Sequence, residues 1–150
     1  MTPRLPPALL LLICAVFGWG LASVFPGLDY DGIRGRVLGI ICIGFSGILL
    51  AVSVGAFRVA RTTVNPLAPN KAQTLVKVGL YRLSRNPMYL AMALALFGVA
   101  FLLANIASFA APIVFVGLMT QFQIKPEERA LKEKFGEEFI TYCRQTRRWI

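Results

Sequence analysis

Residues 88–124 read MYLAMALALFGVAFLLANIASFAAPIVFVGLMTQFQI and contain no charged side chain. Two apolar runs, 88–104 and 109–124, are joined by the short turn 105–108. Because a helix rises about 1.5 Å per residue, each run is slightly short for a bilayer core of about 30 Å. The stretch predicts a tight helical hairpin that tilts little, or dips incompletely, in a membrane.

Two further apolar runs precede this hairpin. Residues 8–25 are uncharged, end at Pro26-Gly27 and are just long enough to span the hydrocarbon. A secretory signal peptide is the alternative, but Arg4 alone precedes the run and the segment 23–26 is a poor cleavage site. We therefore expect a retained helix here and a second spanning helix at 37–57.

The second run carries small residues at spacings of four or multiples of four, which let helix backbones approach closely in lipid. They are Gly35, Gly39, Gly47, Ala51 and Gly55. We expect this stripe to pack against neighbouring helices, and it also permits self-association into an oligomer.

The composition indicates a membrane protein. The 150-residue chain is 57% hydrophobic, whereas a soluble domain of this size needs far more polar surface. With the four apolar runs, this predicts an all-α integral membrane protein with about four transmembrane helices in a single membrane domain, 1–150. We expect its polar parts to be a cytosolic loop at 58–87 and a cytosolic, amphipathic helical segment at 125–150.

The charges predict the orientation. Most of the 16 basic residues lie in 58–87 and 125–150, Arg4 adds one at the N-terminus, and the connection 26–36 balances two arginines with two acids. Four spans place the three basic segments on one side, which the positive-inside rule assigns to the cytoplasm. We therefore expect both termini in the cytoplasm. The net charge of +9 then reflects membrane orientation, and we expect no nucleic-acid partner.

Several chemistries are disfavoured by residue usage. The chain has no histidine, the commonest general base and metal ligand, so zinc hydrolases and Ser/His/Asp enzymes have little support. Its three cysteines are widely separated, and two of them lie inside apolar runs. We expect neither a disulfide framework nor a metal site.

The first segment that could carry chemistry is 79–89, GLYRLSRNPMY, where the chain re-enters the membrane. Asn86-Pro87 predicts a helix start, with Asn86 capping free amides and Pro87 in the first helical position. Arginine and tyrosine also favour the headgroup zone, so a purely interfacial anchor is the alternative. An anchor does not require Gly79 or so many donors beside a turn fixed by proline.

The second segment is 126–142. Pro126 predicts another helix start, with Glu127 and Glu128 in the first turn, where acids complement the helix dipole. Both glutamates flank an apolar stripe that includes Leu131. An amphipathic helix lying on a membrane would place cations at that boundary. We therefore interpret the two carboxylates as facing a ligand.

Together these segments resemble the membrane methyltransferase family that includes isoprenylcysteine carboxyl methyltransferases and bacterial phospholipid methyltransferases. The first family motif resembles G-x-Y-R-x-x-R-[HN]-P-x-Y, which is 79–89 here. The second resembles E-E-x-x-L-x-x-x-F-G-x-x-[YF]-x-x-Y with an arginine-rich end, here 127–142 and then 147–149. The match covers roughly the C-terminal half, and its strength is two motifs in the correct order around a short hairpin.

The resemblance implies a pocket for S-adenosylmethionine that faces the cytosol, with a lipophilic acceptor entering from the bilayer of a bacterial inner membrane. Arginine suits the cofactor's carboxylate, glutamates suit its hydroxyls or ammonium, and aromatic rings suit its sulfonium or adenine. The implied cofactor-binding residues are Gly79, Tyr81, Arg85, Asn86, Tyr89, Glu127, Glu128 and Tyr142. The implied catalytic candidates are Arg148, which would contact the cofactor or orient the acceptor, and Asn86.

Asn86 departs from the eukaryotic prenylcysteine enzymes, which have histidine at this position. Asparagine can donate or accept a hydrogen bond but cannot act as a base. The acceptor, a lipophilic or lipid-borne carboxylate, thiol, amine or phenol, is therefore left open. Two other functions also stay open: a non-catalytic membrane scaffold that binds a partner, and an NADPH-dependent membrane reductase with a similar hairpin.

Overall fold

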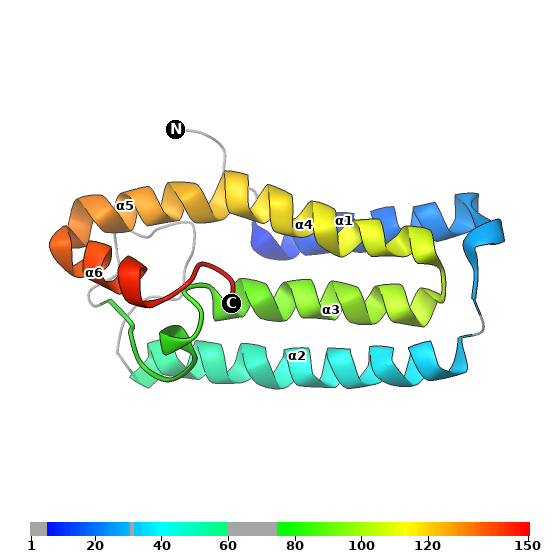
Figure 1. The fold of residues 1–150 in the computed structure, drawn as a ribbon, viewed down its shortest axis with the longest axis horizontal. Coiled ribbons are helices and arrows are strands. Elements are labelled where there is room, and N and C mark those ends of the chain that lie inside the picture. The colour runs from blue at the N-terminus through cyan, green and yellow to red at the C-terminus, as the bar shows by residue number, and fades with distance from the viewer. Residues whose placement is uncertain (1–5, 31, 60–74) are drawn as a thin grey trace.

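The computed structural model describes residues 6–30, 32–59 and 75–150 of the chain. Helices α1 (Pro7–Val24), α2 (Ile33–Val59), α3 (Pro87–Leu103) and α4 (Ala110–Leu118) run side by side along the long axis of the molecule (Figure 1). Two shorter helices, α5 (Lys125–Phe135) and α6 (Glu137–Gln145), extend from one end of the bundle.

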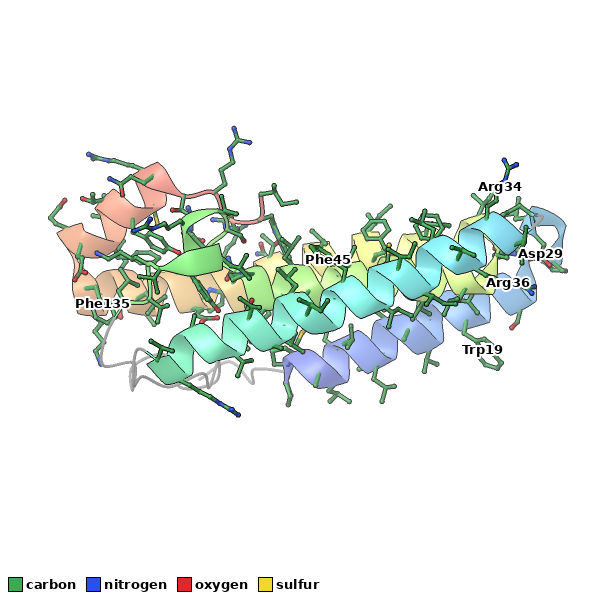
Figure 2. All side chains as sticks on the ribbon, turned by 90° about the horizontal axis from the view of Figure 1, so that it is seen from below. Trp19, Asp29, Arg34, Arg36, Phe45 and Phe135 are labelled. Carbon is green, nitrogen blue, oxygen red and sulfur yellow. The ribbon has the colours of Figure 1, made fainter. Side chains whose placement is uncertain are left out.

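The predicted all-α membrane fold is confirmed. Three helical stretches are long and apolar enough to cross a membrane, namely Pro7–Val24, Ile33–Ala56 and Ile106–Phe135, and the shorter helix Pro87–Leu103 is also apolar. Large apolar side chains such as Trp19 (62% exposed) and Phe45 (57% exposed) point away from the bundle, as expected of surfaces that face lipid (Figure 2).

The helix that carries the last apolar run continues beyond residue 124, where the run itself ends. The chain continues from α4 through a π-helical turn, η5 (Met119–Ile124), directly into α5 (Figure 1). Pro126 does stand at the start of α5, as predicted, but the rod does not break before it. A π turn pairs each carbonyl with the N–H five residues ahead, so the missing N–H of Pro126 does not force a break.

Helix α3 is the central element, and it packs against α2 on one side and against α1 and α4 on the other. The backbones of α2 and α3 approach closely at Gly39 and Gly98: a Cβ at Gly98 would lie 2.9 Å from the Gly39 carbonyl oxygen and 2.6 Å from Cγ1 of Ile43. The expected small-residue contact is therefore made at Gly35 and Gly39. Gly47 and Gly55 face open space.

The hairpin turn is tied to the connection between α1 and α2. Asn105 is fully buried and donates to the Phe25 carbonyl oxygen (2.8 Å) and to Oδ1 of Asp29 (2.6 Å). Its own side-chain oxygen accepts a hydrogen bond from the Ala107 N–H at 2.8 Å. These bonds join the two loops at the end where Asp29, Arg34 and Arg36 gather (Figure 2).

Candidate functional site

The two sequence motifs meet at the opposite end of the bundle, which we call the basic end: residues 75–86, α5, α6 and the tail 146–150. The short 3₁₀ turn Gly79–Arg82 begins at Gly79, whose φ of +59° favours glycine. The tail then lies beside this segment, because the Arg85 N–H donates to the Arg147 carbonyl oxygen at 2.9 Å. Residues far apart in the sequence thus form one cluster.

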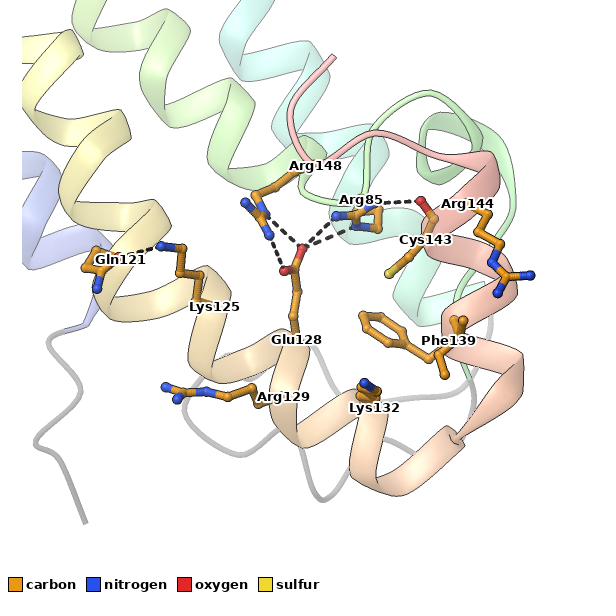
Figure 3. A pocket seen from close by; sticks show the side chains of 11 residues that line it. Arg85, Gln121, Lys125, Glu128, Arg129, Lys132, Phe139, Cys143, Arg144 and Arg148 are labelled. Atoms are coloured by element: carbon orange, nitrogen blue, oxygen red, sulfur yellow. Dashed lines mark hydrogen bonds and ion pairs between the residues drawn. The ribbon is translucent and has the colours of Figure 1, made fainter.

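Glu128 is held between two arginines. Its Oε1 accepts from Nη2 of Arg85 at 2.9 Å, and its Oε2 accepts from Nη2 of Arg148 at 2.7 Å (Figure 3). The side chains of Arg85 and Glu128 are only 12% and 17% exposed. Arg85 also donates to the backbone carbonyls of Cys143 and Thr146, so it fixes the position of α6 and the tail.

Glu127 has a different partner from its neighbour. The Tyr89 hydroxyl donates to Oε2 of Glu127 at 2.9 Å, from the first turn of α3. Tyr142 donates to the Tyr81 carbonyl oxygen at 2.6 Å, which joins α6 to the first motif. All three tyrosine side chains are buried. Burial raises the pKa of both Tyr81 and Tyr142, so their hydroxyls stay neutral donors.

Asn86 does not cap α3, so this prediction was wrong. Its side chain makes no capping hydrogen bond, and instead Nδ2 donates to the Arg148 carbonyl oxygen at 3.0 Å. Pro87 occupies the first turn as predicted. The tail provides a carbonyl oxygen that accepts from the Asn86 side-chain amide, and the sequence around the helix start does not indicate this distant partner.

A cavity of about 640 Å³ opens beside Glu128, between α5, α6 and the tail (Figure 3). This volume is in the range of small-molecule sites. Phe139, Ile140 and Cys143 of α6 form part of its wall, and burial raises the pKa of the Cys143 thiol. The cations that line it are Arg85, Lys125, Arg129, Lys132, Arg144 and Arg148.

The sequence-predicted residues fall into two groups. Arg85, Glu128 and Arg148 line the cavity. The other predicted residues belong to the surrounding cluster rather than to the cavity lining: Gly79, Tyr81, Asn86, Tyr89, Glu127 and Tyr142. The structure thus brings both motifs together, and the role of each residue stays a prediction.

Sequence reasoning assigned no contact to three residues that hold this end together, Gln123, Thr120 and Trp149. Gln123 is buried in the π turn and hydrogen-bonds the Tyr89 side chain. Trp149 donates from Nε1 to Oγ1 of Thr120 at 3.1 Å and so anchors the tail on the rod. A glutamine inside an apolar run was the available signal for the first, but the π turn that aims it has no sequence signature. Among the residues whose structure is described, no group of acids and cysteines is arranged to hold a metal.

Comparison with known proteins gives two matches. The model of a family described as "Phospholipid methyltransferase" matches residues 35–138, which include most of both motifs. A protein of Haemophilus influenzae described as uncharacterized is 38% identical over 63 residues, which are 42% of this chain and the whole of that relative. No solved structure matches the chain.

Proposed function

Because the chain belongs to the phospholipid methyltransferase family, we propose that it transfers the methyl group of S-adenosylmethionine to a lipophilic acceptor at the membrane surface. Acceptors of the carboxylate, thiol, amine or phenol class fit this proposal. Family membership supports methyl transfer in general, and the arrangement of the basic end supports the finer statement.

One observation carries the proposal: two motifs far apart in the sequence converge on one carboxylate. Arg85 of the first motif and Glu128 of the second are separated by 43 positions in the sequence. In the structure, Nη2 of Arg85 lies 2.9 Å from Oε1 of Glu128, beside the cavity. Arg148 of the tail forms a second ion pair with the same carboxylate. An interfacial anchor would leave Arg85 in contact with headgroups, whereas its side chain is only 12% exposed.

The donor set fits the cofactor. Two carboxylates, one half-buried guanidinium and three buried tyrosine rings lie at this end of the bundle, joined in pairs by hydrogen bonds. Arg85 would pair with the carboxylate of S-adenosylmethionine, while Glu127 and Glu128 would accept from its ammonium or ribose hydroxyls. The rings of Tyr81, Tyr89 and Tyr142 would lie against the sulfonium or the adenine. Gly79 supplies the turn that presents Tyr81.

The cofactor supplies an electrophilic methyl group whose transfer breaks a carbon–sulfur bond as the bond to the acceptor forms. The chain's contribution is then to orient both reactants and exclude water. Arg148, held by Glu128, would orient an acceptor that enters beside it. Asn86 is fixed on the tail carbonyl and would position Arg148, since an amide cannot take up a proton.

Binding of S-adenosylmethionine to the detergent-purified protein, measured by calorimetry with NADPH as comparison, tests this proposal. We expect Glu128→Gln to weaken cofactor binding by about tenfold or more, since hydrogen bonds to charged groups contribute about 1.5–3 kcal/mol. Glu127→Gln should also weaken cofactor binding, while the glutamine side-chain oxygen can still accept the hydrogen bond from the Tyr89 hydroxyl. Glu133→Gln, an exposed site on the same helix, should have no effect.

Circular dichroism of each variant checks that the fold is kept. Unchanged affinity in folded Glu127→Gln and Glu128→Gln would remove both glutamates from the site. Binding of NADPH in place of S-adenosylmethionine would favour the reductase, and binding of neither would favour the scaffold.

A further inference from the structure

We propose that the cavity between α5, α6 and the tail binds the phosphate of a membrane lipid whose headgroup is net negative. The cavity shares Arg85, Glu128 and Arg148 with the cluster assigned to methyl transfer, but four further cations that line it lie outside that cluster. The inference rests on these four cations and does not depend on the proposed methyl transfer. It follows from the charge of the cavity, its position along the rod and the chemistry of its donors.

The cavity has a large surplus of positive charge. Six cations line it against the single carboxylate of Glu128, and each oxygen of that carboxylate already accepts from an arginine. Within the described part of the chain, no carboxylate lies within 4.0 Å of the remaining four cations, Lys125, Arg129, Lys132 and Arg144. The sequence itself has no acid between residues 32 and 126. The cavity therefore has a positive charge that would attract an anion.

The same charge disfavours the cofactor as its occupant. S-adenosylmethionine carries an ammonium and a sulfonium against one carboxylate, so its net charge is positive. The surplus of cations on α5 would repel this positively charged cofactor, whereas the same cations would attract a phosphate. Of the residues assigned to the cofactor, Arg85 and Glu128 stand at the wall of this cavity, whereas the three tyrosines and Glu127 do not line it.

The position of the cavity indicates a lipid. Gln121, Lys125, Arg129 and Lys132 follow each other at helical spacing along one face of the rod that leaves the apolar span. Exposed apolar side chains lie before Lys125 on the same rod, namely Phe122 at 63% and Ile113 at 67% exposure. A headgroup in the cavity would thus leave its acyl chains alongside α4, in the hydrocarbon.

The donors suit phosphate. Arg129 and Arg144 present guanidinium groups that can pair with phosphate oxygens in bidentate geometry, and Lys125 and Lys132 add point charges. Basic pockets next to membrane spans bind anionic headgroups, with about 1 kcal/mol contributed per cation near the surface. Soluble phosphates share this chemistry, so the test separates the two sources.

The test is native mass spectrometry of the detergent-purified full chain, titrated with phosphatidylglycerol, phosphatidylcholine or glycerol phosphate. We expect one phosphatidylglycerol to bind, at least tenfold more tightly than either other probe. Arg129→Gln combined with Lys132→Gln should weaken its binding by about tenfold or more. Both positions are exposed, so the fold should be retained, as the melting temperature will show.

The matched control is Arg82→Gln combined with Arg147→Gln, which removes two exposed charges at the same end but outside the cavity. An equal loss of binding in the control would show diffuse attraction and overturn the proposal. Equal affinity for phosphatidylcholine would overturn the requirement for negative charge, and equal affinity for glycerol phosphate would overturn the lipid assignment. Binding of S-adenosylmethionine is measured in parallel on the unsubstituted protein and on the Arg129/Lys132 variant. If the unsubstituted protein binds phosphatidylglycerol but not S-adenosylmethionine, only the proposed methyl transfer is contradicted.

Discussion

Arg85 is the residue on which the basic end depends. Its guanidinium joins three parts of the chain: Glu128 of α5 and the backbone carbonyls of Cys143 in α6 and Thr146 in the tail. Arg148 is the second partner of Glu128, and the hydrogen bonds that it donates to this carboxylate raise the pKa of Arg148. A buried charge whose partner is removed is costly, since desolvation is no longer offset.

Arg85→Ala should therefore lower both stability and cofactor binding. We expect a loss of about 3 kcal/mol in the free energy of unfolding, the magnitude typical of breaking a buried ion pair. Chemical denaturation in detergent would measure it, with the exposed Arg82→Ala as control. A loss as small as that of the control would contradict a structural role for Arg85.

At the scale of elements, the sequence predicted only part of the packing between α2 and α3. The stripe of small residues on α2 predicted a close helix contact, and Gly39 makes it with Gly98 of α3. The stripe did not show that Gly47 and Gly55 face open space, because the crossing of two helices brings only part of a face into contact.

Gly98→Ala should destabilise the bundle, because its Cβ would lie 2.6 Å from Cγ1 of Ile43 and 2.9 Å from the Gly39 carbonyl oxygen. We expect a cost of about 1–3 kcal/mol, the usual range for overpacking a tight contact. Gly47→Ala is the control and should be neutral, since nothing lies within 4 Å of the added Cβ. Thermal unfolding in detergent measures both, and equal melting temperatures would mean that the two helices are not closely packed.

The whole molecule is an apolar bundle with charges at both ends. Asp29, Arg34 and Arg36 gather at one end, and α5 and α6 extend from the other (Figures 1 and 2). Basic residues greatly outnumber acids only at the basic end, so we propose that this end faces the cytosol. Both proposed binding sites would then face the compartment that supplies the cofactor.

Single cysteines introduced into a chain whose three native cysteines are serine test this orientation. Ile150→Cys lies at the basic end and Leu28→Cys at the other, and both positions are exposed (77% and 42%). In intact bacterial cells, we expect a membrane-impermeant maleimide to label Leu28→Cys and to label Ile150→Cys only after the membrane is opened. The reverse pattern would invert the assignment.

The sequence by itself determined the class of fold, the number of apolar helices and the two motifs, because hydropathy and local residue order are properties of short segments. It also indicated Arg85, Glu127 and Glu128 as a group. Only the tertiary structure decided that the adjacent glutamates take different partners, that Asn86 binds the tail instead of capping α3, and that cations of α5 and α6 line one cavity. These outcomes depend on a π turn and on contacts between residues as many as 62 positions apart, which local sequence does not encode.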